Sequence, residues 1–242
     1  MSTIGFFGDS FCAKKDMPFF SKNTGTTYIK KLELNYNTKI LQLGVDGSSI
    51  WDLILLQFNP IKTNLPDICI FVWTNNGRLF HREVRNINAS SLLKHHNSKN
   101  LIWKSAQLYY ENLHDWEKED LEHLSVMHYF DTEILSKLDT GIKIIHLWSY
   151  GDIDWDNRDR FNPENIKYPY RWKTGMEIRP ALASISMIDV QDDNIHFHDS
   201  RPNHLDGEQK NELVFSWIKH AIDNYNPGSC LNFDYDVINF IK

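Results

Sequence analysis

The sequence predicts an α/β protein in which helices cover both faces of a parallel β-sheet. Four short runs are almost continuously apolar and are bounded by turn residues, as expected for strands that are covered on both faces. Segments with helical spacing of their apolar residues separate these runs, and this alternation is typical of parallel sheets. The four predicted strands span residues 3–8, 38–45, 67–74 and 143–150.

Apolar periodicity predicts four helices of the main body. The first spans residues 26–36, and the second spans residues 48–58, where a serine at position 48 or 49 could cap it. The third, over residues 120–138, is followed by Gly141, a residue suited to end a helix. The last spans residues 207–225, before an Asn-Pro-Gly sequence.

Together these elements predict a three-layer, flavodoxin-like doubly wound parallel sheet in a single domain, residues 1–242. Residues 76–120 are too long for a simple loop, and they contain a helical pattern over residues 101–115, so we expect a helical insertion. Residues 151–180 are predicted to form an irregular lip. Both stretches should emerge near the carboxyl ends of the strands, where open α/β sheets hold their ligands.

Composition excludes several classes of protein. The formal net charge is −6 and no run of Lys and Arg occurs, which argues against a nucleic-acid-binding surface. Cys12, Cys69 and Cys230 are too few and too widely spaced for a disulfide framework or a zinc ribbon, and we expect Cys69 in the core. The sequence shows neither a secretory leader pattern nor an apolar stretch of membrane length, which predicts a cytoplasmic protein without membrane contact.

The segment Gly8-Asp9-Ser10, at the end of the first strand, suggests a nucleophile. Gly8 allows the backbone to turn sharply, and Asp9 can brace the turn through hydrogen bonds to the backbone. The Ser10 hydroxyl would then lie at the ligand-binding edge of the sheet. A serine hydroxyl is a weak nucleophile unless a base lies within hydrogen-bond reach.

Three other segments could complete such a site at the same edge. Gly44 follows the second strand, where its N–H can face a developing oxyanion, and Asn75 follows the third strand with a side-chain amide. His204 lies in an Arg-Pro-Asn-His-Leu segment before the last helix, so that it returns to this edge. An imidazole with an oriented second nitrogen is the base that such a serine requires.

These four blocks resemble the SGNH (GDSL-like) hydrolase superfamily, whose Ser, Gly, Asn and His map onto Ser10, Gly44, Asn75 and His204. The resemblance implies a serine hydrolase of the esterase or acetylesterase kind that needs no cofactor and no metal. Its oxyanion hole would consist of the N–H groups of Ser10 and Gly44 and the side chain of Asn75. Because the lip is polar and aromatic, we expect an ester of a small-molecule or glycan carrier rather than a lipid.

Two departures from the family pattern leave alternatives open. Arg201 occupies the position, three residues before the histidine, where the family has its acid. Asp199 is the nearest substitute as the third catalytic residue, unless a backbone carbonyl orients His204 in a dyad. The third block lacks the Gly-x-Asn-Asp form, so that Asn76 could replace Asn75, or Arg78 could bind an anion.

The same residues allow two other functions. An acyltransferase would use them with a second alcohol in place of water. A binding module would keep the fold without the chemistry, and the arginine in the acid's position supports this alternative. A flavin or nucleotide binder is disfavoured, because no Gly-rich phosphate loop follows the first strand.

Two clusters could suggest metal sites, but neither is expected to form one. His196 and His198 would face the same side of a strand, yet no second pair of ligands accompanies them, so we interpret them as strand residues at a polar edge. The acids at positions 152, 154 and 156 begin like a calcium loop. However, Asn157 and Pro163 occupy the positions of the required glycine and bidentate glutamate.

The lip is rich in aromatic side chains, which are suited to stacking on sugar rings. Packing of the lip onto the domain is the interpretation that we favour for these residues. They are Trp155, Tyr168, Tyr170 and Trp172.

Overall fold

The computed structural model describes residues 2–13, 27–84, 87–151, 162, 165–186, 188–191, 194–197, 205 and 208–233, with the backbone alone for 89–90, 188–191 and 194–197. In this part of the chain a six-stranded, entirely parallel sheet has the strand order β2-β1-β3-β4-β5-β8. The strands are β1 (Thr3–Gly8), β2 (Lys39–Gln42), β3 (Ile68–Trp73), β4 (Lys143–Trp148), β5 (Met176–Arg179) and β8 (Cys230–Asn232).

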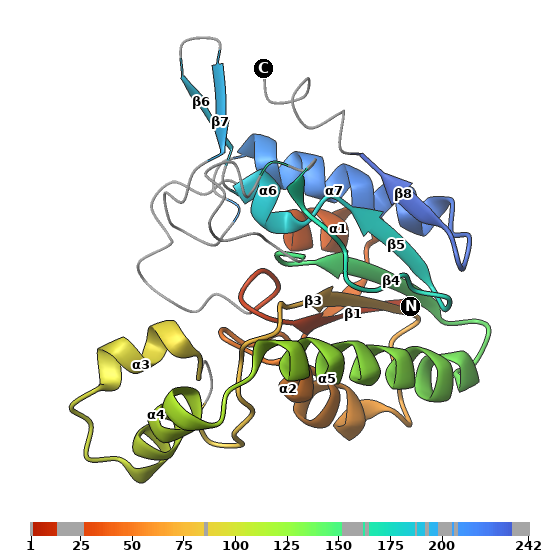
Figure 1. Cartoon of the computed structure of the whole chain (residues 1–242). Helices are drawn as coiled ribbons and strands as arrows, with labels where there is room; N and C mark the ends of the chain where they lie inside the picture. Colours follow the sequence, from red (N-terminus) through yellow and green to blue (C-terminus); the bar gives the residue numbers. More distant parts are fainter. Residues whose placement is uncertain are drawn as a thin grey trace.

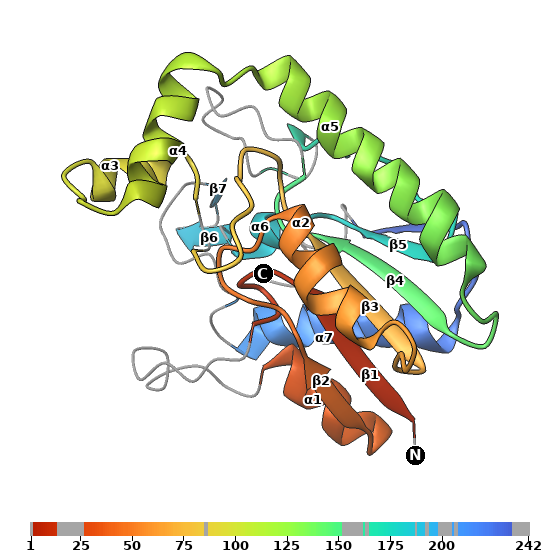
Figure 2. The ribbon, with the colours of Figure 1, turned by 90° about the horizontal axis from the view of Figure 1, so that it is seen from below.

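Helices cover both faces of this sheet (Figures 1 and 2). On one face α1 (Tyr28–Tyr36) packs against α7 (Glu208–Asp223). The other face is covered by two long helical segments, each of which passes from α-helix through a π-helical turn into a 3₁₀ turn. They are α2 (Ile50–Asp52) with Leu53–Phe58 and Asn59–Ile61, and α5 (Trp116–Tyr129) with Phe130–Ile134 and Leu135–Lys137. The predicted three-layer, doubly wound α/β architecture is confirmed.

The helical insertion is confirmed as well, with a different C-terminal limit. Helices α3 (Ala89–His95) and α4 (Leu101–Asn112) pack together and project away from the sheet (Figures 1 and 2). Helix α5, predicted to begin at residue 120, begins at Trp116 because the Asp115 side chain accepts a hydrogen bond from Lys118 N and caps it.

The prediction that residues 151–180 are irregular is wrong at their C-terminal end, where β5 forms. The charged residues of this strand interrupt the apolar run by which a strand would be predicted. In the structure Glu177 is buried and accepts hydrogen bonds from Trp148 Nε1 (3.0 Å) and Arg179 Nε (2.8 Å). Helix α6 (Leu182–Ser186), strand β6 (Ile188–Gln191) and the short edge strand β8 were not predicted. Strand β6 forms an antiparallel hairpin with β7 (Asn194–Phe197), which contains His196, a residue interpreted from the sequence as lying in a strand. Among the described helices, none combines the length and apolar character that crossing a membrane requires.

Buried aromatic rings fill the layer between the sheet and the α2 and α5 segments. Trp73 stacks on Trp172 with ring centroids 4.4 Å apart, and His146 stacks on Trp172 at 4.0 Å. His146 Nδ1 accepts a hydrogen bond from Trp73 Nε1 (3.0 Å), and its Nε2 donates to the carbonyl of Thr174 (2.7 Å). Both ring nitrogens are therefore used by the neutral imidazole, and burial lowers the pKa of His146 to about 4.

We expect acid to destabilise the protein partly through His146. Its pKa is about 4 in the folded chain against an ordinary value of 6.5. The native state therefore binds fewer protons, and the contribution to stability is complete above pH 6.5 and is lost as the pH falls towards 4. Urea unfolding between pH 7.5 and pH 4 measures this loss as a fall in the free energy of unfolding.

The variant His146→Phe should be less stable at neutral pH, because it leaves Trp73 Nε1 and the Thr174 carbonyl without their partner. Its free energy of unfolding should nevertheless change less between pH 6.5 and pH 4 than that of the natural chain. The exposed His220→Phe serves as control and should leave this dependence unchanged. Equal pH dependence in His146→Phe and the natural chain would contradict the assignment.

Candidate active site

Ser10 lies in the turn that follows β1, with 5% of its surface exposed. Asp9 braces this turn, as the sequence predicts: its Oδ1 accepts from Phe11 N (3.1 Å), and its backbone carbonyl accepts from Cys12 N (3.1 Å). The Tyr28 hydroxyl, from α1, donates to the Phe11 carbonyl (2.7 Å). The turn is thus held by hydrogen bonds from within and from the neighbouring helix.

The end of β1 leaves no room for a side chain at Gly8. Its φ is 150°, and a Cβ atom there would collide with the Val72 carbonyl oxygen of β3 and lie 2.8 Å from Val72 Cβ. The buried Gln57 side chain binds both polar groups of this residue. Gly8 N donates to Gln57 Oε1 (2.7 Å), and Gln57 Nε2 donates to the Gly8 carbonyl (2.9 Å) and to Ser48 Oγ (3.0 Å).

Gln57 was not among the residues predicted from the sequence. The only signal was a polar residue within an otherwise apolar helical segment, between Leu53 and Phe58. An amide fits this position because it supplies both an acceptor and donors, which an apolar side chain lacks. Gln57 therefore positions the strand end from which the Ser10 turn begins.

Gly44 packs directly against the Ser10 turn. It forms an isolated parallel bridge with Ala13, and Val45 N donates to the Gly8 carbonyl (3.0 Å). A Cβ atom on Gly44 would lie 3.1 Å from the Asp9 carbonyl oxygen and would collide with Cys12 Sγ. The structure thus brings these two predicted residues, Ser10 and Gly44, into one small region of backbone.

Asn75 follows β3 at the same edge, because β1 and β3 are parallel neighbours with Gly8 opposite Val72. Within the described chain, its side chain makes one hydrogen bond, in which Thr74 Oγ1 donates to Asn75 Oδ1 (3.5 Å). Asn76 differs, since its Nδ2 donates to Asp120 Oδ1 on α5.

His204 and Asp199, the predicted base and acid, lie outside the described residues, as does Arg201. His198, the side chain of His196 and the acids at 152, 154 and 156 are also outside them. Among the described residues, no group of three or more His, Cys, Asp and Glu side chains is placed to hold a metal ion.

A buried carboxyl lies directly before Ser10 in the chain. Asp9 is fully buried, and its Oδ2 has no hydrogen-bond partner among the described residues. Arg78 Nη1 lies 3.8 Å from this oxygen and donates to the Ser48 carbonyl (3.0 Å). Burial raises the pKa of Asp9, whereas the Arg78 guanidinium and the Phe11 N–H act in the opposite direction.

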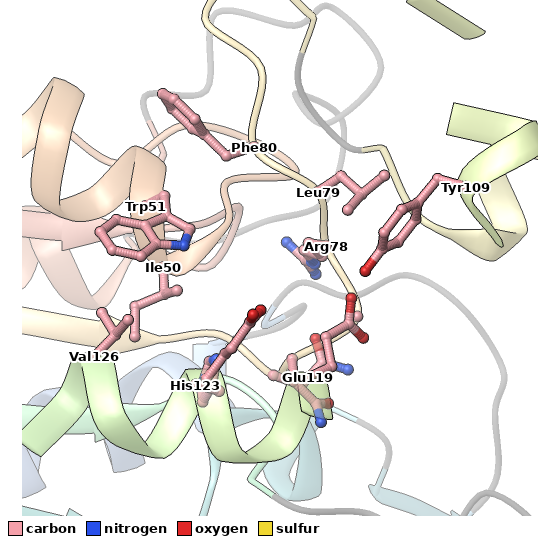
Figure 3. A pocket seen from close by; sticks show the side chains of 13 residues that line it. Ile50, Trp51, Arg78, Leu79, Phe80, Tyr109, Glu119, His123 and Val126 are labelled. Atoms are coloured by element: carbon pink, nitrogen blue, oxygen red, sulfur yellow. The ribbon is translucent and has the colours of Figure 1, made fainter. Parts of the chain in front are cut away.

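Two adjoining cavities open at this edge of the sheet, of about 390 Å³ and 200 Å³ (Figure 3 shows the larger). Asn75, Asn76 and His123 line both cavities. Arg78 and several aromatic side chains also line the larger cavity. The volume of this cavity falls within the range of small-molecule binding sites.

The lip aromatics that the structure describes serve packing, as the favoured interpretation predicts. Trp172 is 2% exposed in the aromatic core, and the hydroxyl of Tyr170 donates to Asp131 Oδ2 (3.0 Å). Tyr168 accepts from Ala181 N (3.1 Å) and lies under the Arg179 guanidinium. Trp155 lies outside the described residues.

No protein-family model matches this chain, and no curated protein sequence matches it. The resemblance to SGNH hydrolases therefore rests on the sequence blocks themselves.

Replacing Gln57 by Met, which has a similar shape but no amide, should destabilise the fold. The Gly8 N–H would stay buried without a partner, at a cost of about 1–3 kcal/mol in the free energy of unfolding. Urea unfolding measures the difference. Gln107→Met on α4 is the control, because its amide bonds only Glu111 at the surface. Equal effects of the two substitutions would contradict the role of Gln57.

Proposed function

We propose that the chain is a serine hydrolase that cleaves an ester, with Ser10 as nucleophile and His204 as general base. The observation that carries the proposal is the packing of Gly44 against the Ser10 turn, with Asn75 at the end of the adjacent strand. A nucleophile on a rigid turn beside backbone and amide donors is the arrangement that acyl transfer requires.

The reaction would proceed through an acyl-enzyme. Ser10 Oγ attacks the ester carbonyl carbon while His204 accepts the hydroxyl proton, and the tetrahedral oxyanion is stabilised by the N–H groups of Ser10 and Gly44 and the amide of Asn75. Collapse expels the alcohol, which receives the proton from His204. Water, deprotonated by His204, then attacks the acyl group and frees Ser10. Asp199, or a backbone carbonyl, would orient the imidazole.

Asn75 suits the oxyanion role better than Asn76. The amide nitrogen of Asn76 already donates to Asp120, whereas the single side-chain hydrogen bond of Asn75 within the described chain uses its oxygen. The Asn75 amide N–H groups are therefore the ones available to a substrate, and Asn75 borders both cavities.

Hydrolysis of p-nitrophenyl acetate tests the nucleophile. Ser10→Ala should abolish turnover, because no other group would form the acyl-enzyme. The matched control Ser125→Ala, on the exposed face of α5, should keep the activity of the natural chain. Unchanged hydrolysis by Ser10→Ala would end the proposal.

Replacing Asn75 by Ala should lower kcat by about 10²–10³, the usual effect of losing one oxyanion donor. Asn76→Ala is the control and should have a much smaller effect on kcat. Steady-state kinetics on p-nitrophenyl acetate separate the two variants. A larger loss in Asn76→Ala than in Asn75→Ala would assign the oxyanion site to Asn76 instead.

The second candidate is a binding module that has kept the fold without the chemistry, and Arg201 in the position of the family's acid favours it. Such a module would turn over no ester while binding a ligand equally well with Ser or Ala at position 10. Acyl transfer, the third possibility, would appear as a new ester when an acceptor alcohol is added to the reaction.

A further inference from the structure

The larger cavity lies between α2, α5 and the loop after β3 (Figure 3). Arg78 links this cavity to the Ser10 turn, because it lines the cavity and its Nη1 is 3.8 Å from Asp9 Oδ2, the residue before Ser10. If the ester of a substrate is cleaved at Ser10, this cavity is the place for another part of the same substrate.

The walls of the cavity are largely aromatic and aliphatic. Trp51 of α2 is 42% exposed and gives a ligand a ring to contact. The apolar wall residues are Ile50, Trp51, Leu79, Phe80, Tyr109 and Val126. Such a lining suits a flat apolar group.

Arg78 supplies unused hydrogen-bond donors to this apolar space. Its side chain is 12% exposed, and within the described chain its only hydrogen bond is from Nη1 to the Ser48 carbonyl. A guanidinium has five N–H groups in a planar fork that matches a carboxylate. Within the described residues most of these donors therefore have no hydrogen-bond partner, and they can bind a ligand.

His123 supplies a second unused polar atom, from α5 on the other side of the cavity (Figure 3). The residue is 8% exposed, its Nε2 has no hydrogen-bond partner among the described residues, and it borders both cavities. Burial lowers its pKa to about 4, so the ring is neutral at pH 7. A buried polar atom without a partner is costly, and a ligand atom would remove that cost.

The two acids at the cavity do not compete for Arg78. Glu119 bonds His114 Nε2 (3.0 Å), and Glu122 pairs with Lys118 (3.3 Å). Their negative charges repel a phosphate dianion more strongly than a singly charged carboxylate. Together with the aromatic walls and the Arg78 fork, this charge arrangement suits a monocarboxylate attached to an aromatic group better than a phosphate.

We propose that this cavity binds a substrate portion in which a carboxylate is attached to an aromatic ring, with Arg78 binding the carboxylate and His123 Nε2 bonding the same ligand. Trp51 would contact the ring. The proposal deepens the proposed hydrolysis: the natural ester would carry a free carboxylate on an aromatic portion that lies beside Ser10.

Binding to Ser10→Ala tests the site without any turnover. Calorimetry should show 2-naphthoate binding at least about tenfold more tightly than the neutral 2-naphthamide, because only the carboxylate pairs with Arg78. Adding Arg78→Met should remove this preference, and Arg78→Lys should restore it in part, since an ammonium keeps the charge but not the fork. Thermal unfolding checks that each variant is folded.

If the Arg78 variants do not fold, Trp51→Ala provides the test instead, because Trp51 lies outside the buried core. It should weaken both compounds by a similar factor, whereas Tyr129→Ala, an exposed aromatic on α5 outside the cavity, should affect neither. Equal affinity of Ser10→Ala for 2-naphthoate and 2-naphthamide, or full binding in Trp51→Ala, would overturn the inference.

The outcome is distinguishable from that of the proposed function. If 2-naphthoate binds as expected while the natural chain hydrolyses no ester, the cavity assignment is supported and the hydrolase proposal fails. If p-nitrophenyl acetate is hydrolysed through Ser10 but the carboxylate preference is missing, the hydrolase proposal is supported and the cavity assignment is overturned.

Discussion

The contact between Gln57 and Gly8 fixes the point at which the first strand leaves the sheet. Strands β1 and β3 approach so closely there that only a glycine fits, and its N–H and carbonyl are satisfied by one amide from the helical layer below. The Ser10 turn begins at this anchored residue, and Gly44 packs against the turn. The candidate site thus depends on buried hydrogen bonds of the layer beneath the sheet.

Next to this rigid region a buried carboxyl group, that of Asp9, lies beside the guanidinium of Arg78. Asp9 holds the turn with one carboxylate oxygen, while the other faces Arg78 at 3.8 Å without a hydrogen bond in the described chain. Arg78 lies between this carboxyl and an aromatic cavity, so that a ligand bound to Arg78 would act on the turn that carries Ser10. Arg78 would then contribute both to the stability of the fold and to the recognition of a ligand.

The sequence predicted the central strands that form apolar runs and missed β5, in which a buried polar residue interrupts the apolar pattern. Strands β1, β3 and β4 read as apolar runs, whereas β5 was missed because Glu177 is buried with Trp148 and Arg179 as partners. For the candidate site, the Gly-Asp-Ser segment pointed to Ser10. The ends of the second and third predicted strands pointed to Gly44 and Asn75. Arg78 was named from its place after the third strand as a possible anion ligand, but its contact with Asp9 depends on the folded chain. Gln57 and His123 were not predicted, because their contacts join segments that are distant in the sequence.

Covalent labelling with a fluorophosphonate tests the central claim most directly, because only an activated serine reacts quickly. Mass spectrometry of the digested protein should place the adduct on Ser10, and His204→Ala should slow labelling by about 10²–10⁴, the usual contribution of a general base. An adduct at another residue, or an equal rate in His204→Ala, would contradict the account.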